Sequence, residues 1–148
     1  LLSRMQQMGL PVPQPVAVQV ERNGVMYSAD IMTRRILNAT TLAKKLEQQV
    51  LPRDTWQELG KVIRQFHLRG VWHADLNANN VMINEDRQIF LIDFDRGQLR
   101  RPVRYWQQAN LQRLKRSLLK LQGRADSFYY NASDWQALLD GYSAEALD

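Results

Sequence analysis

The sequence predicts an α+β fold in which a strand-rich beginning is followed by a larger helical part. Two apolar, strand-like runs, 16–21 and 25–32, flank Arg22-Asn23-Gly24, and Asn-Gly between two such runs is a strong signal for a β-hairpin. Residues 55–70 and 102–122 instead repeat apolar side chains at helical period. Two further short strands are predicted between these helices, at residues 81–84 and 89–92.

The chain begins inside a predicted helix. Residues 1–8 carry a helical pattern that Gly9 is expected to end, and the first residue is Leu1 rather than methionine. Prolines at positions 11, 13 and 15 then require an extended connector. We therefore expect this chain to be a fragment of a longer protein whose start lies upstream.

The helical part is predicted to follow a polar linker over residues 33–39. A short helix is expected at 40–49, and Thr55 and Glu58 have capping-box spacing at the start of a longer one that Gly70 ends. The predicted buried face of that helix consists of Trp56, Leu59, Val62, Ile63 and Phe66. In the helix at 102–122 the buried side is predicted to be Trp106, Leu111, Leu114, Leu118 and Leu121, and a last helix is expected at 134–140.

The second pair of strands predicts a site, because residues equidistant from a hairpin turn face each other. With a turn centred between residues 86 and 87, Asn80 and Asp93 should lie side by side at the open end of the hairpin. An amide oxygen and a carboxylate are hard ligands suited to Mg²⁺, with phosphate oxygens and waters completing the shell. Asp75 lies in the polar loop that leads into the first strand. A carboxylate there suits orientation and deprotonation of an attacking hydroxyl in phosphoryl transfer.

Taken singly, these residues have ordinary structural explanations. Asp75 suits a turn, Asn80 suits a turn, Asp93 suits a strand end, and His73 suits a packing or capping role, the only role we predict for it. Their order and spacing favour function, because His73-x-Asp75-Leu76-x-x-x-Asn80 resembles the catalytic loop of protein kinases. Asp93-Phe94-Asp95, 18 positions after Asp75, resembles the D-F-G motif of the same fold.

The chain departs from the pattern of kinases that phosphorylate proteins. Asp95 replaces the glycine of D-F-G, Asn77 stands where many protein kinases carry a phosphate-contacting lysine, and no A-P-E segment follows. The exact amino-acid sequence of residues 71–78 and 91–97, and that of the proline-rich connector, instead resembles the lipopolysaccharide-core kinases of Gram-negative bacteria. This resemblance covers residues 1–122.

The resemblance implies a protein-kinase-like fold, truncated upstream. Residues 1–32 would be a remnant of the small N-terminal lobe, 33–39 the hinge, and 40–148 the helical catalytic C-terminal lobe. It also implies transfer of the ATP γ-phosphate to a hydroxyl, the 4-hydroxyl, of 3-deoxy-D-manno-octulosonic acid (Kdo) on a lipid A precursor. Asp75 would act on the hydroxyl, and Asn80 and Asp93 would hold Mg²⁺.

The ATP-binding elements of such a kinase are only partly represented. No G-x-G-x-x-G motif occurs in the sequence, and the glycine-rich loop, strand lysine and helix glutamate would lie before Leu1, so we expect this fragment alone to be inactive. The extended hinge is expected to contact the adenine. The candidate residues there are Asp30, Ile31, Met32 and Thr33.

Charge and composition predict an anionic partner. The net charge is +5, and residues 96–124 contain nine basic residues without an Asp or Glu. Arg96, Arg100 and Arg101 follow Asp93 directly and are predicted to bind an anionic acceptor, whereas basic residues further along fit either a solvated helix face or the membrane surface. Nucleic acid is not expected, because no recognised binding motif accompanies the charge. The absence of cysteine excludes disulfides and thiolate metal sites.

Three other functions remain open. A heptose kinase of the same core pathway differs only in its acceptor, and a choline- or aminoglycoside-type kinase would need a cationic acceptor that the basic segment fits poorly. A non-catalytic pseudokinase would explain the missing upstream elements but not the intact Asp75, Asn80 and Asp93. For the preferred function the expected location is the cytoplasmic face of the inner membrane, by peripheral attachment.

Overall fold

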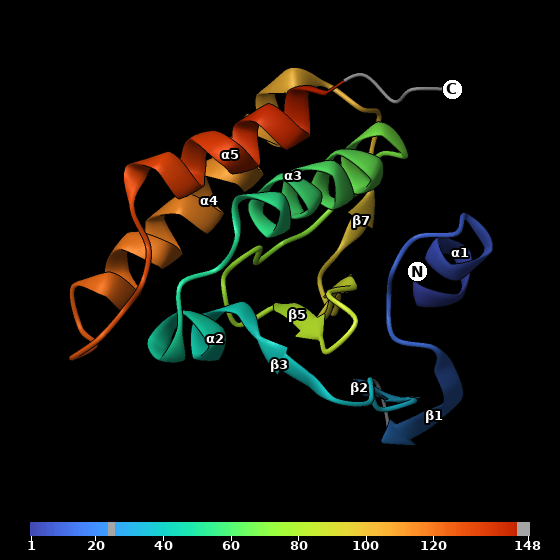
Figure 1. The fold of residues 1–148 in the computed structure, drawn as a ribbon. Helices are drawn as coiled ribbons and strands as arrows, with labels where there is room; N and C mark the ends of the chain where they lie inside the picture. The colour runs from blue at the N-terminus through green and yellow to red at the C-terminus, as the bar shows by residue number, and fades with distance from the viewer. Residues whose placement is uncertain (24–25, 145–148) are drawn as a thin grey trace.

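The computed structural model describes residues 1–23 and 26–144. After the first helix, groups of strands alternate with pairs of helices, and the three long helices all follow residue 52 (Figure 1). The helices are α1 (Leu2–Gln7), α2 (Leu42–Gln48), α3 (Arg53–Leu68), α4 (Arg104–Gln122) and α5 (Ala132–Ser143). The strands are β1 (Pro15–Asn23), β2 (Met26–Thr33), β3 (Ala39–Thr41), β4 (Val71–Trp72), β5 (Val81–Asn84), β6 (Ile89–Leu91) and β7 (Gln98–Leu99).

The chain begins with a helix and a two-stranded antiparallel sheet, as predicted. α1 ends before Gly9, which adopts a positive φ of 71° that favours glycine. β1 and β2 pair antiparallel from Asn23 and Met26 outwards, and the predicted turn at 22–24 falls partly outside the described residues. The proline-rich connector is attached to the end of β6, because the Leu91 N–H donates to the Pro11 carbonyl at 3.1 Å.

The predicted apolar face of α3 is confirmed, since all five of its residues are buried in the core. The start of this helix differs from the prediction. Pro52 is the N-cap and makes no side-chain capping bond, while Thr55 is buried one turn inside the helix. The capping-box prediction was therefore wrong, because proline already has the φ that suits a helix start and tertiary packing takes Thr55 into the core.

α5 packs along α3 (Figure 1), and glycines make the approach possible. A Cβ on Gly60 would overlap the Leu138 carbonyl oxygen, and one on Gly141 would overlap the Gln57 carbonyl oxygen. α4 buries the predicted Trp106, Leu111, Leu114 and Leu118, and leaves Leu121 half-buried. α5 extends beyond the predicted helix at both ends, with an Asn131–Asp134 capping box at its start.

The site is positioned by two small sheets that frame a loop. β3, β5 and β6 form one antiparallel sheet, and β4 pairs with β7 in another. β3, β4 and β7 were not predicted, because strands of two or three residues are formed by tertiary contacts rather than by local pattern. Residues 73–80 run from β4 to β5 and therefore lie between the two sheets.

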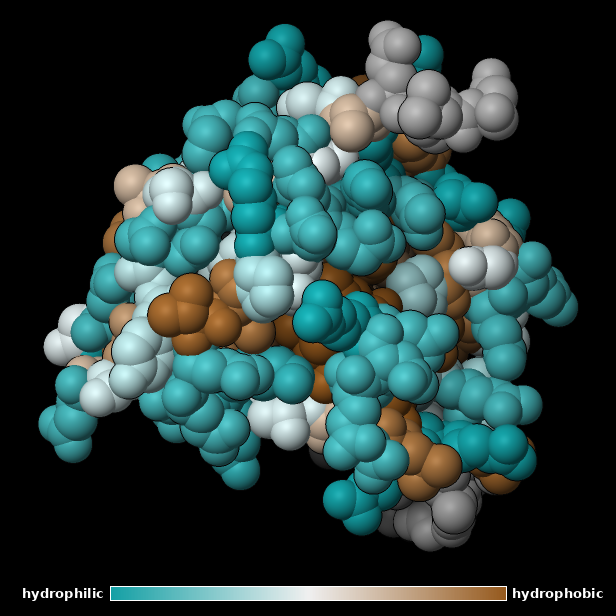
Figure 2. All heavy atoms as spheres, viewed as in Figure 1, coloured by the Kyte–Doolittle hydropathy of each residue, from teal (hydrophilic) through white to brown (hydrophobic). Residues whose placement is uncertain are grey.

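The mixed α/β architecture agrees with the predicted fold class, and the division into lobes stays a prediction. The surface seen in Figure 2 is mostly hydrophilic, and hydrophobic side chains show in a hollow in the middle of that face. Within the described residues, none of the helices combines the length and the apolar composition that crossing a bilayer requires.

Candidate active site

The β5–β6 hairpin brings Asn80 close to Asp93, but with a register one position from the predicted one. Val81 pairs with Leu91, and the Ile92 N–H donates to the Asn80 carbonyl at 3.0 Å. Asn80 thus faces Ile92, and Asp93 is the next residue. The turn is centred on residue 86 because Arg87 adopts a positive φ of 61°. The prediction counted residues from a turn centred between 86 and 87, and so did not include this local backbone conformation.

Asp93 leaves the hairpin with an unusual backbone. Its φ of 61° lies in the left-handed region, which costs a non-glycine residue of order 1 kcal/mol and persists only where the surroundings enforce it. The next residue supplies that enforcement. Phe94 is buried, stacks on Phe66 with ring centroids 5.6 Å apart, and lies 4.5 Å from the His73 ring. The packed phenylalanine therefore fixes the direction in which the Asp93 carboxylate projects.

His73 connects the loop of Asp75 to the strand that precedes Asp93. Its Nδ1 accepts from the Asp75 N–H at 3.1 Å, so its Nε2 carries the proton and donates to the Ile92 carbonyl at 2.8 Å. Burial lowers the pKa of His73 below its ordinary value, which keeps this neutral tautomer. The Asn110 amide brackets the His73 backbone, accepting from its N–H at 3.3 Å and donating to its carbonyl at 3.0 Å. The predicted structural role of His73 agrees with these contacts.

Two asparagine side chains hold the Asp75 backbone from the other side. The Asn80 Nδ2 donates to the Asp75 carbonyl at 2.9 Å, and the Asn77 Nδ2 donates to the same oxygen at 3.2 Å. The Asn77 Oδ1 in turn accepts from the Asn79 N–H at 2.8 Å, so Asn77 organises the loop. The Asn80 NH₂ group is thus used within the loop, so its amide oxygen is the atom of this side chain that could bind a cation.

Arg113 is a site residue that the sequence reasoning did not identify as one. Its Nη1 lies 3.3 Å from Asp75 Oδ1, and both side chains are about half exposed. Arg113 had been assigned either to a solvated helix face or to membrane contact. Only the packing of α4 beside the loop brings residues 38 positions apart together, and no local signal in the sequence reports such a contact.

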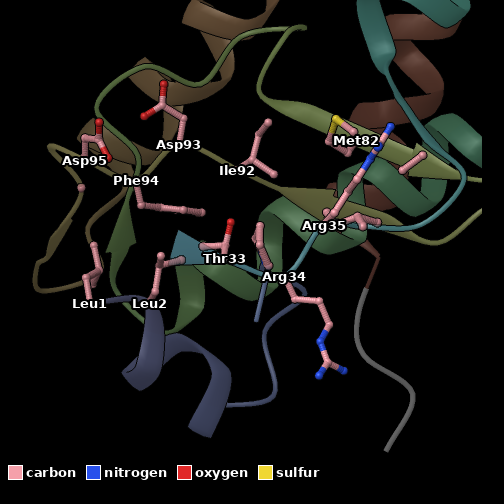
Figure 3. A pocket seen from close by; sticks show the side chains of 14 residues that line it. Leu1, Leu2, Thr33, Arg34, Arg35, Met82, Ile92, Asp93, Phe94 and Asp95 are labelled. Carbon is pink, nitrogen blue, oxygen red and sulfur yellow. The ribbon is translucent and has the colours of Figure 1, made fainter. Parts of the chain in front are cut away.

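A cavity of about 820 Å³ opens beside Asp93 (Figure 3). Leu1 and Leu2 of α1 border one side of it, and residues 33–36 border another. In Figure 3 the Arg34 guanidinium points away from the carboxylates of Asp93 and Asp95. Thr33, a residue of the predicted hinge, lines this cavity. The side chains of the other nucleotide candidates, residues 30–32, lie outside what the structure describes.

A second cavity, of about 690 Å³, opens beside Asp75 and contains neither Asp93 nor the hinge. Arg96 and Arg113 line it together with Trp72 and Gln98. Arg100, another acceptor candidate, lies over the Trp72 ring at 3.6 Å and donates to the Gln98 Oε1 at 2.9 Å. It therefore forms the outer edge of the cavity without lining it.

The third acceptor candidate, Arg101, is exposed and lines neither cavity. Its carbonyl accepts from the Trp106 Nε1 at 2.9 Å. Asp95 and Gly97, in contrast, line both cavities. The turn that carries them is thus the boundary between the two.

The donor set fits Mg²⁺. Asn80 Oδ1 and the Asp93 carboxylate are hard oxygens at one end of the hairpin, and Mg²⁺ bound with a nucleotide takes only one or two protein ligands, with phosphates and water supplying the others. Among residues 1–23 and 26–144 there is no cluster of three or more His, Cys, Asp or Glu. The residues present therefore suit a metal ion that binds together with a nucleotide phosphate. They do not form a metal site made of protein ligands alone.

Comparison with known proteins identifies relatives of the whole chain. Residues 1–142 match the lipopolysaccharide kinase (Kdo/WaaP) family. Proteins named 3-deoxy-D-manno-octulosonic acid kinase are 38% identical over 148 residues in Haemophilus influenzae Rd, 42% over 147 in Mannheimia succiniciproducens and 41% over 136 in Xylella fastidiosa. These alignments cover 96%, 96% and 90% of this chain, respectively.

The match covers much less of the relatives, because the chain spans 60%, 60% and 53% of their lengths, respectively. The family match over residues 1–142 nevertheless includes every candidate residue described above, from Asp30 to Arg113. A family match over nearly the whole chain, together with these identities, settles the relationship: the chain belongs to the lipopolysaccharide kinase (Kdo/WaaP) family.

Proposed function

We propose that the protein containing this chain transfers the γ-phosphate of ATP, with Mg²⁺, to the 4-hydroxyl of Kdo on a lipid A precursor. The observation that carries the proposal is the hydrogen-bond network of His73, which ties the Asp75 loop to the strand end bearing Asp93, while Asn80 is bonded to the Asp75 backbone. The names of the curated relatives support the choice of Kdo as the acceptor.

Each group has a defined task in this reaction. Asp75 accepts the proton of the attacking hydroxyl and orients it, and Asn80 and Asp93 hold Mg²⁺ against the phosphates. When bound, the metal neutralises charge on the phosphate oxygens. His73 acts on the reaction only through the positions of Asp75 and Ile92, because both of its ring nitrogens are already hydrogen-bonded.

The cavity beside Asp93 suits the nucleotide. It is large enough at about 820 Å³, and the extended hinge at Thr33 borders it. Extended backbone offers N–H and C=O groups to the edge of an adenine. Asp30, Ile31 and Met32 continue β2 next to Thr33 and remain candidates for this contact.

The cavity beside Asp75 suits the acceptor. Its lining balances Arg96 and Arg113 against the carboxylates of Asp75 and Asp95, and Arg100 at its edge adds a further positive charge. Kdo carries a carboxylate and the lipid A beneath it carries phosphates, which Arg96 and Arg113 match. A cationic aminoglycoside or choline would fit the basic segment 96–124 poorly, because that segment contains no Asp or Glu. A heptose acceptor in a phosphorylated core satisfies the same charges and is the alternative that needs a direct test. Intact Asp75, Asn80 and Asp93 count against a pseudokinase.

Because this acceptor is a membrane lipid, the proposal includes peripheral attachment to the cytoplasmic face of the inner membrane. The basic segment 96–124 provides charge for an anionic surface. No role for nucleic acid is included.

The deciding experiment is a phosphotransfer assay of the full-length protein with ATP and Mg²⁺. Kdo-lipid A, heptosylated core and an aminoglycoside would be offered in parallel, with an analogue lacking the 4-hydroxyl of Kdo and the Asp75→Asn variant as controls. Phosphate incorporation that requires Asp75 and the 4-hydroxyl is expected with Kdo-lipid A only. Equal or better transfer to heptose would indicate that the protein is a heptose kinase. No transfer to any acceptor would support the pseudokinase alternative.

A further inference from the structure

The end of α3 and the start of α4 form one continuous surface, because several contacts join them. Val71 pairs with Leu99 across β4 and β7, and the Arg100 N–H donates to the Gly70 carbonyl at 2.7 Å. Gly70 has a positive φ of 72°, and a Cβ there would overlap the Arg100 carbonyl oxygen. The Gln107 side chain donates to the His67 carbonyl at 3.2 Å. Residues 68–70 and 99–105 therefore lie next to each other.

This surface exposes apolar side chains that the core does not use. Tyr105 is 86% exposed, Leu68 is 58%, Val103 is 44% and Leu99 is 37%. Single exposed apolar residues are ordinary on a protein surface, but a group of them on adjoining segments marks a site of contact with another molecule or a membrane. Tyrosine in particular places an apolar ring and a hydroxyl at an apolar–polar boundary.

Arginines accompany these apolar side chains. Arg69, Arg100, Arg101 and Arg104 are all exposed on the same two segments. No Asp or Glu occurs in residues 59–74 or 96–124, so neither segment offsets this charge. Arginine can lay its apolar stem along a hydrophobic surface while its guanidinium remains among phosphates. We define the interfacial patch as these four arginines together with Leu68, Leu99, Val103 and Tyr105.

The interfacial patch adjoins the cavity that contains Asp75. Arg100 covers the face of Trp72, and both Trp72 and the Gln98 that holds Arg100 line that cavity. A lipid held at the interfacial patch would therefore present its headgroup at the open edge of the cavity.

We propose that the interfacial patch is the surface with which the protein docks on an anionic lipid bilayer, Tyr105, Leu68, Val103 and Leu99 entering the headgroup region and the arginines pairing with lipid phosphates. Charge alone would suit any polyanion. Exposed apolar side chains among the arginines suit a bilayer, which is apolar a few ångströms beneath its charges. This inference rests on the membrane attachment included in the proposed function and adds the surface that makes it, and its test requires no turnover.

The test measures flotation of the full-length protein with vesicles of phosphatidylcholine alone and of phosphatidylcholine with one third phosphatidylglycerol. Arg69→Gln/Arg104→Gln should weaken partitioning onto the anionic vesicles about 30-fold, at about fivefold per arginine, and should change partitioning onto neutral vesicles little. Leu68→Ser/Val103→Ser/Tyr105→Ser should weaken binding to both kinds of vesicle by about tenfold, and should leave binding to a soluble polyanion such as heparin unchanged.

The same helix supplies matched controls. Arg116 and Lys120 are exposed, and Leu119 is an exposed apolar side chain, but they lie about 18 Å or more along α4 from Arg104. Arg116→Gln/Lys120→Gln and Leu119→Ser should bind vesicles like the unmodified protein. An equal loss in the control double variant would show diffuse attraction by the whole basic segment. Unchanged vesicle binding of the triple serine variant would show a polyanion site instead. Either result, or failure of the unmodified protein to float, would overturn the proposal.

Discussion

The two cavities on either side of the Asp95–Gly97 turn differ in what lines them and in how they are built. The cavity beside Asp93 is bordered by α1, the hinge and the β5–β6 hairpin, so its walls come from sequence positions 1 to 97. The cavity beside Asp75 is bordered by the catalytic loop, residues 95–98 and a single arginine of α4. The first therefore includes the very start of the chain, whereas the second is built from segments between Trp72 and Arg113: the end of β4, two loops and α4.

The difference indicates how the work is divided. Asp93, the candidate metal ligand, lines the larger cavity, and Asp75, the candidate base, lines the smaller one. This is the arrangement expected if nucleotide and acceptor occupy separate cavities and meet at the boundary. Transfer in line needs the attacking and leaving oxygens on opposite sides of the phosphorus. The His73 hydrogen bonds to the Asp75 N–H and the Ile92 carbonyl span that boundary.

The largest effects on turnover should come from replacing the candidate carboxylate beside each cavity by an amide. Asp93→Asn should lower kcat by about a thousandfold or more and weaken Mg²⁺-dependent ATP binding, because an amide cannot supply the charge that the metal requires. Asp75→Asn should lower kcat by about 10²–10⁴, the usual contribution of a general base, and leave ATP binding intact. Calorimetric ATP titrations with and without Mg²⁺, beside turnover, would separate the two. Loss of ATP affinity in Asp75→Asn would contradict the division into cavities.

The next effect concerns the link between the cavities. His73→Gln should lower kcat by about 10–100-fold, because one or two hydrogen bonds that position Asp75 and Ile92 are lost, while the Km for ATP changes much less. Since burial lowers the pKa of His73 from 6.5, turnover should show no loss from its protonation until the pH is below 6.5. A kcat–pH profile of both proteins tests this, and a wild-type decline centred at or above 6.5 that His73→Gln removes would contradict it.

His67 provides a matched control for that variant, because it is a buried histidine outside both cavities. Its Nδ1 lies 2.8 Å from the Tyr142 hydroxyl, and burial lowers its pKa to about 4. The unfolded chain therefore binds this proton at a higher pH than the folded protein does. The free energy of unfolding should fall as pH decreases from about 6.5 to about 4, and His67→Gln should flatten that fall without removing activity from folded protein. Denaturant melts at several pH values would measure it.

The smallest effect should come from the arginine of the acceptor cavity. Arg113→Gln should raise the Km for an anionic acceptor about tenfold, since the pair with Asp75 is half exposed and partly screened, and should leave the Km for ATP unchanged. Arg113→Lys should recover only part of the loss, because lysine lacks the two parallel donors of a guanidinium. Arg116→Gln on the same helix is the control. A rise in the Km for ATP alone would indicate that Arg113 contributes to nucleotide binding rather than to acceptor binding.

Local pattern was sufficient for most of the fold. The Asn-Gly pair between two apolar runs indicated β1 and β2, helical periodicity indicated α3 and α4 with their buried faces, and glycine ended α1 and α3. The motif around Asp75, Asn80 and Asp93 indicated the family, which the comparisons confirm. These features depend on residues close in the chain, whose preferences for turn, strand or helix do not require distant partners.

Tertiary structure decided the remaining features. The one-residue change in the β5–β6 register is a local exception, set by the left-handed Arg87. Packing formed β3, β4 and β7, which are too short to show a pattern. It also brought Arg113 to Asp75 and Arg100 over Trp72. Each of these depends on packing between segments far apart in the chain, and the residues involved carry no local preference for it. The sequence by itself therefore determined the family and which groups are candidates for the chemistry, and the packing of α4 and β7 decided which charges surround them.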